Sequence, residues 1–472
     1  MNQLTNELHP PDAARWPSIR ELLVGSKRDF TTGPLSRAVV ILAIPMVLEM
    51  LMQSVFELAD IYFVGRLGPD ALAAAGLTAS VIVLVFAIAI GLSMGIAATV
   101  SRRIGEKNPE EAAEASYQAI LLAIVVSIPV AIVGIVFARE ALLFMGATEH
   151  VADIGRGYFA LTFGANIVVV LLFMLNAIFR GAGDAAFALR ALFIANTLNI
   201  VLDPILIFGL GPIPALGLFG AGVATVIGRA VGIAVQLHLL TSGRGNLTLR
   251  LKSYRPQAER LKRLIRISLP AVAQFFVGTA SWMLIMRLVS QFGTNATAGY
   301  TVAIRVIVFA LLPSWGMGNA AAALVGQCLG ADKPDRAEKA VWMTSLANTA
   351  FLTVCGILLF FFAPEAVRLF TNDPAAVDIG ALCLRTIAFS YPFYGFGMVV
   401  VQAFNGAGDT STPTAINLIA FWIVQIPLGY VLSLPLDFGP KGVFIAIAIA
   451  QSLLAIIAVA WFRRGKWKSV VV

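Results

Sequence analysis

Long apolar runs of about 20 residues recur along the whole chain, and they constrain its fold more than any other feature. A helix of this length spans the hydrocarbon core of a bilayer. The 472-residue chain is 59% hydrophobic and only 13% charged, with a mean hydropathy of +0.86. A soluble protein of this size needs more charge on its surface. Because the runs are continuous rather than alternating, the sequence predicts an all-α polytopic membrane protein.

Twelve spans can be placed on the sequence. They cover roughly residues 38–64, 73–99, 117–138, 158–179, 187–209, 217–240, 263–290, 298–324, 341–363, 381–404, 414–434 and 441–462. Basic residues gather in alternate connections, most densely at 244–266, whereas 210–217 and 291–297 carry none. Positive charge marks the cytoplasmic side. We therefore expect a multi-pass protein of a bacterial-type inner (plasma) membrane, with both termini in the cytoplasm.

The sequence also repeats itself at a constant offset. The matching segments include RLGPDALAAAG (66–76) with QFGTNATAGYT (291–301), VADIG (151–155) with AVDIG (376–380), and RGAGD (180–184) with NGAGD (405–409). Two parallel copies of six spans are a usual architecture for alternating access to a central cavity. We expect 12 transmembrane helices in two pseudo-symmetric six-helix bundles that face such a cavity. A duplicated structural scaffold without transport is the alternative.

This repeat divides the chain into five parts. They are a cytoplasmic N-terminal tail (1–37), an N-lobe (38–240), a basic cytoplasmic linker (241–262), a C-lobe (263–462) and a basic cytoplasmic C-terminal tail (463–472). The chain shows no metal-ligand histidine pair, no Ser/His/Asp pattern and no nucleotide-binding loop. We therefore expect no enzyme activity and no cofactor, and an electrochemical source of energy.

Polar residues that occur in only one copy of the repeat point to chemistry rather than shape. Asp60, Asn199, Asp203 and Thr225 all align with aliphatic residues of the second copy. An aspartate at membrane depth costs about 2.5–3.5 kcal/mol on insertion scales, so it is usually paired, protonated or functional. Counted at 1.5 Å per residue, Asp60, Asp203 and Thr225 lie roughly 8–12 Å below the outer boundary. Asn199 precedes Asp203 by one helical turn on the same face.

These four residues form a candidate cation site. Two carboxylates, an amide and a hydroxyl make an oxygen-rich pocket, to which Pro204 can add a backbone carbonyl. Such a pocket suits a hard cation, and Na⁺ is the only metal we expect. Two adjacent carboxylates can equally share a proton. A static polar network that only binds helices together is the alternative.

Other polar residues of the spans carry weaker signals. Glu49, Gln53 and Glu57 lie with Asp60 on one side of the first span and form a polar track, or they pack against other helices. The three arginines at the edges of outer-half spans, which are Arg287, Arg305 and Arg385, are expected to snorkel to the interface. Methionine and phenylalanine side chains are suited to line a cavity for flat, cationic ligands.

The sequence resembles the MATE (multidrug and toxic compound extrusion) transporters over nearly its whole length. The resemblance is carried by IPMVLEMLMQSVFELADIYFVGRLG (44–68), by the FRGAGD and FNGAGD turns, and by NIVLDP (199–204). Pro45, Gln53 and Asp60 stand at the family's spacing. In the DinF-like branch, the residues that correspond to Asp60, Asn199, Asp203 and Thr225 form the cation site of the first lobe. Other branches carry an acidic residue on span 7, but AVAQFFVGTASW (271–282) has none, so the resemblance favours the DinF-like branch.

The resemblance implies a function and a mechanism. We expect a secondary active multidrug efflux antiporter that exports amphipathic, cationic xenobiotics in exchange for H⁺ or Na⁺. Binding of the cation is expected to bend span 1 at Pro45 and to expel the drug. Export of a lipid-like or lysophospholipid-type substrate by a flippase is the alternative function. The expected partners are the small-molecule substrate and membrane lipid, without nucleic acid, and the expected oligomeric state is a monomer.

Overall fold

The computed structural model describes residues 17–18, 22, 28–250, 254–470 and 472, and these residues contain no β-strand. Most of the predicted N-terminal tail therefore lies outside the described residues. The first repeat contains α2 (Leu35–Gly65), α3 (Pro69–Gly105), α4 (Pro109–Val136), α5 (Ala138–Phe144), α6 (Glu149–Gly164), α7 (Asn166–Ala182), α8 (Ala185–Phe208) and α9 (Gly217–Thr241).

The second repeat has the same order of elements. It contains α10 (Ala258–Ser290), α11 (Thr294–Gly330), α12 (Pro334–Phe361), α13 (Ala363–Arg368), α14 (Pro374–Ala388), α15 (Tyr391–Ala407), α16 (Ser411–Asn417), the π-helix η2 (Leu418–Gln425), α17 (Ile426–Ser433), α18 (Pro440–Phe462) and the short 3₁₀-helix η3 (Lys466–Ser469). Helices α3 and α11 begin and end at positions that the sequence repeat matches to each other, and so do α4 and α12. The predicted duplication is therefore confirmed in the structure.

The predicted number of spans is also confirmed. Among the described residues, 11 helices are long and apolar enough to cross a membrane, and the count rises to 12 if the bent pair α14–α15 is one span. That pair bends by 61°. Several helices extend beyond the predicted spans, and α10 begins at Ala258, inside the predicted linker. Charged residues such as Glu259 and Arg260 are good helix formers, and a reading of hydropathy alone stops short of them.

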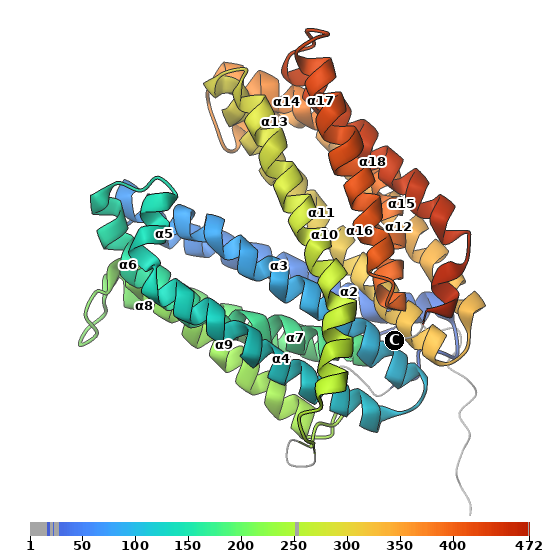
Figure 1. Cartoon of the computed structure of the whole chain (residues 1–472). Coiled ribbons are helices and arrows are strands. Elements are labelled where there is room, and N and C mark those ends of the chain that lie inside the picture. The colour runs from blue at the N-terminus through green and yellow to red at the C-terminus, as the bar shows by residue number, and fades with distance from the viewer. Residues whose placement is uncertain (1–16, 19–21, 23–27, 251–253, 471) are drawn as a thin grey trace, which may run out of the picture.

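The two bundles diverge at one end of the molecule and converge at the other (Figure 1), where the C-terminus lies. We call these the open end and the closed end. Helix α2 begins at the closed end, because Phe30, just before it, contacts Gly183 and accepts a hydrogen bond from Arg336. Gly183 directly precedes the turn into α8, so α8 also starts at the closed end and ends at the open one.

Glycines bring the two bundles together near the closed end. At several of them an added Cβ would overlap the opposite bundle, and four such contacts are Gly91 with Val272, Gly316 with Val47, Gly105 with Gln327, and Gly330 with Arg102. At the offset of the sequence repeat, the two residues of the first pair match the two residues of the second pair, but each residue lies in the other bundle. The third and fourth pairs match in the same way. Small residues let helix backbones approach closely inside a membrane. We call this two-fold set of contacts the seam.

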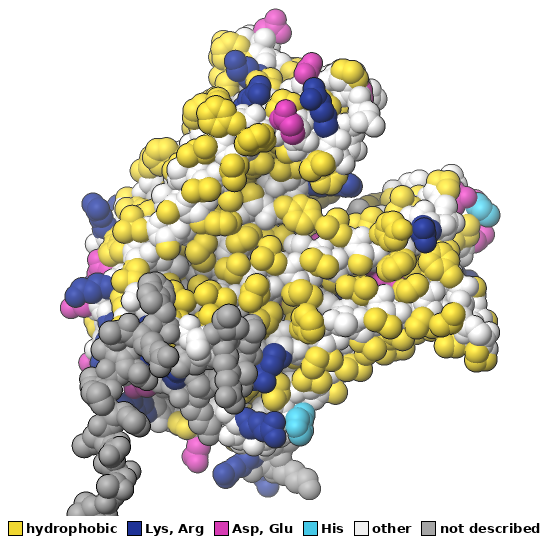
Figure 2. Space-filling view, turned by 180° about the vertical axis from the view of Figure 1, so that it is seen from behind, with side chains coloured by type: hydrophobic (Ala, Val, Ile, Leu, Met, Phe, Trp, Pro, Cys, Tyr) yellow, Lys and Arg dark blue, Asp and Glu magenta, His cyan; other side chains and the backbone are white. Residues whose placement is uncertain are grey.

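Terminal segments cover the closed end. Before α2, the backbone carbonyls of Phe30, Thr32 and Gly33 accept hydrogen bonds from Arg336 of the second bundle. After α18, Trp467 is fully buried and stacks on Phe462 at 4.5 Å between ring centroids. The face seen in Figure 2 is hydrophobic across its middle, and its charged side chains gather toward the ends. This distribution is that of a multi-pass membrane protein.

Candidate functional site

Helices α8 and α9 hold two of the predicted site residues in contact. The side-chain amide of Asn199 donates a hydrogen bond to the Thr225 hydroxyl at 3.2 Å. The helices approach closely here because Gly228 of α9 has no side chain, and a Cβ on it would crowd Asn199. Asn196, almost one turn before Asn199, donates to the backbone carbonyl of Met52 and so links α8 to α2.

Asp60 of α2 and Asp203 of α8 face the same region of the first bundle. The two carboxylates are close enough to interact electrostatically. Asp203 is fully buried and Asn199 is only 2% exposed, whereas Asp60 and Thr225 are half-buried. The structure thus brings together all four residues that the sequence singled out, and we call them the first-lobe cluster.

Oxygen atoms of this cluster are left without hydrogen-bond donors. Asp60 Oδ1, Asn199 Oδ1 and both carboxylate oxygens of Asp203 are buried, and none has a hydrogen-bond partner in the described part of the chain. A buried oxygen without a donor is costly, and more so when it carries charge. A proton or a hard cation relieves this cost directly, and Na⁺ fits a donor set made only of oxygen.

Two further side chains belong to the site, and sequence analysis missed both. Tyr158 of α6 interacts electrostatically with Asp60 and Asp203. Arg229 of α9 interacts with Asp60, Glu57 and Tyr158. Arg229 follows Thr225 by one helical turn and is the only Lys, Arg, Asp or Glu residue in α9. An ionisable residue inside a span is a signal that would have identified it, whereas nothing in the sequence marks Tyr158.

The polar track of α2 divides into two parts. Gln53 donates to the Glu57 carboxylate at 3.2 Å, and Glu57 lies within the field of Arg229. Glu49 is buried nearer the closed end, where its carboxylate lies 3.9 Å from the Arg180 guanidinium of α7. Glu49 therefore has a counter-ion of its own and is separate from the first-lobe cluster.

Pro45 lies inside α2, and the helix continues through it without interruption. It is buried two residues from Val47, which belongs to the seam. A bend at Pro45 would therefore disturb the contact between the bundles. The role of Pro45 in transport stays a prediction.

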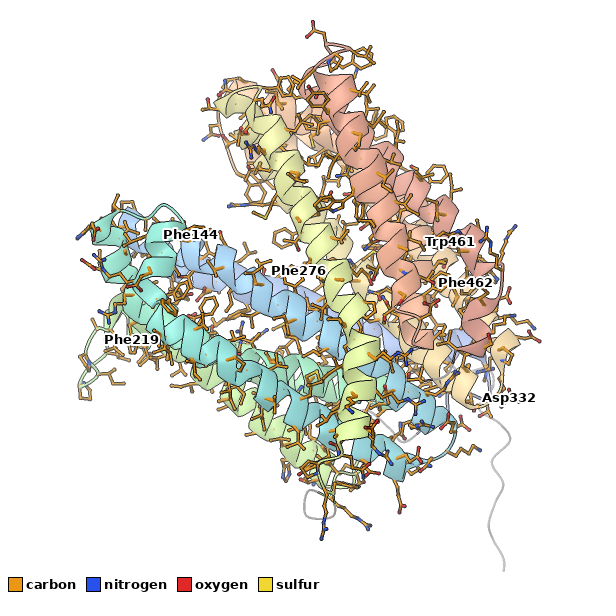
Figure 3. All side chains as sticks on the ribbon, viewed as in Figure 1. Phe144, Phe219, Phe276, Asp332, Trp461 and Phe462 are labelled. Carbon is orange, nitrogen blue, oxygen red and sulfur yellow. The ribbon has the colours of Figure 1, made fainter. Side chains whose placement is uncertain are left out.

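The second bundle presents a different surface to the space between the bundles. The positions that correspond to Asp60, Asn199 and Asp203 are Ile285, Val424 and Leu428. Figure 3 shows Phe276, which is 38% exposed, on the side of α10 that faces the first bundle. Of the three arginines noted in the sequence, Arg385 donates to the carbonyl of Phe360 at 3.0 Å, and Arg305 lines an open pocket with Thr297 and Thr301.

Comparisons with known proteins agree with the repeat and the fold. The family model MatE matches this chain twice, over residues 45–205 and 270–431. The probable multidrug resistance protein YoeA of Bacillus subtilis is 27% identical over 89% of this chain and 92% of its own length. The probable multidrug resistance protein NorM of Thermotoga maritima is 24% identical over 90% of this chain and 92% of its own.

A solved structure resembles the whole fold. A multidrug resistance MATE family transporter of the MOP superfamily, in an outward-facing conformation, superimposes with a TM-score of 0.87 at 26% identity, over 94% of this chain and 100% of that one. The expectation of a non-enzymatic, multi-pass membrane protein is thereby confirmed. The chain belongs to the MATE (multidrug and toxic compound extrusion) family of membrane transporters.

Proposed function

We propose that this protein is a secondary active multidrug efflux antiporter, which exports amphipathic, cationic compounds in exchange for H⁺ or Na⁺. Relatives named as multidrug resistance or multidrug export proteins support the efflux function. The absence of a carboxylate from residues 271–282 of α10 supports the DinF-like branch. No domain for ATP is apparent in the sequence, so an ion gradient supplies the energy.

The observation that carries this proposal is the first-lobe cluster. Its buried oxygens without donors are a site where cation binding is favourable, and they lie in one bundle only. A ligand shifts a conformational equilibrium only if it binds the two conformations differently. Because Asp60 stands on α2 and Asp203 on α8, any movement of α2 relative to α8 changes the distance between the two carboxylates. The affinity for a cation is therefore coupled to conformation.

The same logic assigns directions to the transport cycle. Basic residues gather at the closed end, so the positive-inside rule places that end in the cytoplasm and the open end outside an inner (plasma) membrane. In this orientation the open conformation admits external cations to the cluster and releases the exported compound. Pro45 of α2, between the cluster and the closed end, is the position at which α2 bends when the cation binds.

The experiment that tests the proposal is dye efflux from proteoliposomes. Purified protein exports a fluorescent cationic dye under an imposed Na⁺ gradient or an imposed pH gradient. The wild type responds to one of them, and Asp60→Asn abolishes that response. The matched control is Asp70→Asn, because Asp70 is a solvent-exposed aspartate in the first turn of α3.

Two results would count against the proposal. Wild-type protein that exports no dye under either gradient contradicts antiport of cationic compounds. Export by Asp60→Asn at the wild-type rate means that the first-lobe cluster is a static polar network. In both cases a monodisperse protein with a cooperative unfolding transition shows that the fold is intact.

A further inference from the structure

Arg229 brings a permanent positive charge into a site that otherwise consists of acidic and neutral side chains. Arginine stays protonated in proteins. The side chain is half-buried and projects from the middle of α9, one turn from Thr225. It interacts electrostatically with Asp60 and with Glu57 of the neighbouring helix α2. Because this positive charge offsets one carboxylate, it reduces the number of cations that the site needs for neutrality.

Packing restrains the Arg229 side chain near α2. Its guanidinium carbon lies 6.0 Å from the centroid of the Phe56 ring, which is a cation–π distance. Phe56 is only 7% exposed and precedes Asp60 by one helical turn, so the two residues share a face of α2. The aromatic contact therefore places the guanidinium against the face of α2 that carries Asp60, with which it interacts electrostatically.

Asp203 has no such neighbour. It is fully buried, and the charged group that acts on it is Asp60. Among the described residues, no basic side chain forms an ion pair with Asp203. The two aspartates of the cluster are thus unequal, because Asp60 interacts with a guanidinium and Asp203 lies one turn from the neutral side chain of Asn199.

A second acid of α2 also has an arginine from another helix as its counter-ion. Glu49 of α2 lies 3.9 Å from Arg180 of α7, and both side chains are largely buried. Burying an acid next to an arginine of an adjacent helix lowers the cost of its charge. In the first bundle, both buried or half-buried acids of α2 have an arginine from another helix, while Asp203 of α8 has none among the described contacts.

We propose that Arg229 is the built-in counter-ion of Asp60, so that Asp203 is the one carboxylate left to be neutralised by an exchangeable monovalent cation. This inference rests on the proposed function. Two ionised aspartates and one arginine sum to a charge of −1, which a single cation neutralises. Glu57 is exposed and accepts a hydrogen bond from Gln53, so it is counted outside the cluster.

The charge count predicts the order of cation affinities among four variants. Arg229→Gln makes the net charge of the cluster −2, and Na⁺ binds about tenfold or more tightly than to the wild type, as expected for unit charges a few ångströms apart in a partly buried site. Arg229→Lys keeps the charge and binds Na⁺ as the wild type does. Asp60→Asn brings the sum to zero and weakens binding. The double variant Asp60→Asn/Arg229→Gln returns to −1 and recovers binding.

The measurement is Na⁺-dependent thermal unfolding of the purified full-length protein in detergent. NaCl is varied against choline chloride at constant ionic strength, and the shift of the unfolding temperature gives the apparent affinity. Unfolding without Na⁺ and size-exclusion profiles show that each variant is folded. If Arg229 served only in packing, the double variant would not recover Na⁺ binding. Recovery therefore supports its role as the counter-ion of Asp60.

Equal Na⁺ affinity of Arg229→Gln and wild type would overturn the inference, and so would a double variant that binds as weakly as Asp60→Asn. The proposed function is tested separately by dye efflux. Loss of efflux in Asp60→Asn together with unchanged Na⁺ affinity in Arg229→Gln rejects the counter-ion but leaves the antiporter. Normal efflux in Asp60→Asn rejects the antiport mechanism itself.

Discussion

At the scale of single residues, Asp203 shows how a group that lowers the stability of the fold can serve the proposed binding of a cation. It is fully buried and its two carboxylate oxygens have no hydrogen-bond partner among the described residues. Such a group lowers stability unless a bound cation or proton satisfies it. In the proposed cycle, this carboxylate, whose burial costs stability, is the one that a bound cation neutralises.

Replacement of Asp203 tests this trade-off. Asp203→Asn removes a buried charge and keeps the shape, so we expect the unfolding temperature in the absence of coupling cation to rise by about 2–4 °C. The same variant loses gradient-driven dye efflux. Differential scanning fluorimetry and proteoliposome efflux measure the two effects. A variant that is less stable than the wild type and still transports would contradict the interpretation.

Thr225 acts through its neighbour. Its hydroxyl accepts the hydrogen bond of Asn199, and Thr225→Val removes that acceptor with little change of volume. A side-chain hydrogen bond between membrane helices is worth about 0.6–1.7 kcal/mol. We expect the apparent affinity for the coupling cation, measured from the gradient dependence of efflux, to fall about threefold to tenfold. Thr78→Val is the control, since its hydroxyl only bonds the carbonyl of Ala74 in its own helix.

Sequence analysis identified the acids of the cluster but not the charge that balances one of them. The four residues of the first-lobe cluster were recognisable because each differs from an aliphatic partner at the matching position of the second copy. Arg229 lies one turn after Thr225 on α9, and no motif includes it. Its interaction with Asp60 and its contact with Phe56 depend on how α9 is rotated against α2, which the order of residues does not specify.

At the scale of helices, hydropathy predicted the spans well and their irregularities poorly. Apolar length decides whether a segment crosses the bilayer, so all twelve spans were found. The break between α14 and α15 and the π-helical turns of η2 lie inside continuous apolar sequence. Such irregularities arise from packing against neighbouring helices, and the hydrogen bond from the indole of Trp422, in η2, to the carbonyl of Val277 in α10 is one such contact.

Close approach of helices in the seam leads to a further prediction. Gly316 of α11 lies against the backbone of Val47, so Gly316→Leu cannot be accommodated while the closed end is shut. We expect this variant to hold the bundles apart there and to lose dye efflux. Gly278→Leu in α10 is the matched control, because a Cβ at Gly278 meets no atom within 4 Å.

Distances between spin labels at the closed end distinguish the two variants. Labels on the closed-end turns at Lys107 and Asp332 should move apart in Gly316→Leu and keep the wild-type distance in Gly278→Leu. These residues follow the seam ends of α3 and α11 and are not part of it. An unchanged distance in Gly316→Leu would show that the helices of the seam accommodate the larger side chain without separating at the closed end.

At the scale of the whole molecule, the C-terminal segment ties the two bundles together. Arg102 and Arg103 of α3 donate to the carbonyls of Val470 and Val472, while Lys468 pairs with Glu338 of α12 at 2.6 Å. The pairing with Glu338 raises the pKa of Lys468, so this link persists across the physiological pH range. The segment therefore favours the conformation in which the closed end is shut.

Removal of residues 466–472 should weaken that preference. We expect the truncated protein to expose Ser101, which is fully buried at the bundle interface. The measurement is the rate of maleimide labelling of Ser101→Cys in a background without native cysteines, with and without the truncation. Trp461→Ala, a substitution on α18 outside the segment, serves as control. Equal labelling rates with and without the truncation would show that the segment does not favour the shut conformation of the closed end.

The seam also has the geometry of a homodimer interface drawn inside one polypeptide. Each bundle offers a self-complementary patch to its twin, as the subunits of a two-fold dimer do. A substitution on that patch disturbs one of the equivalent contacts that hold the closed end together. Residues away from the patch do not carry this constraint. The two bundles can therefore share one frame and still differ in their buried polar residues, as Asp60 and Asp203 differ from Ile285 and Leu428.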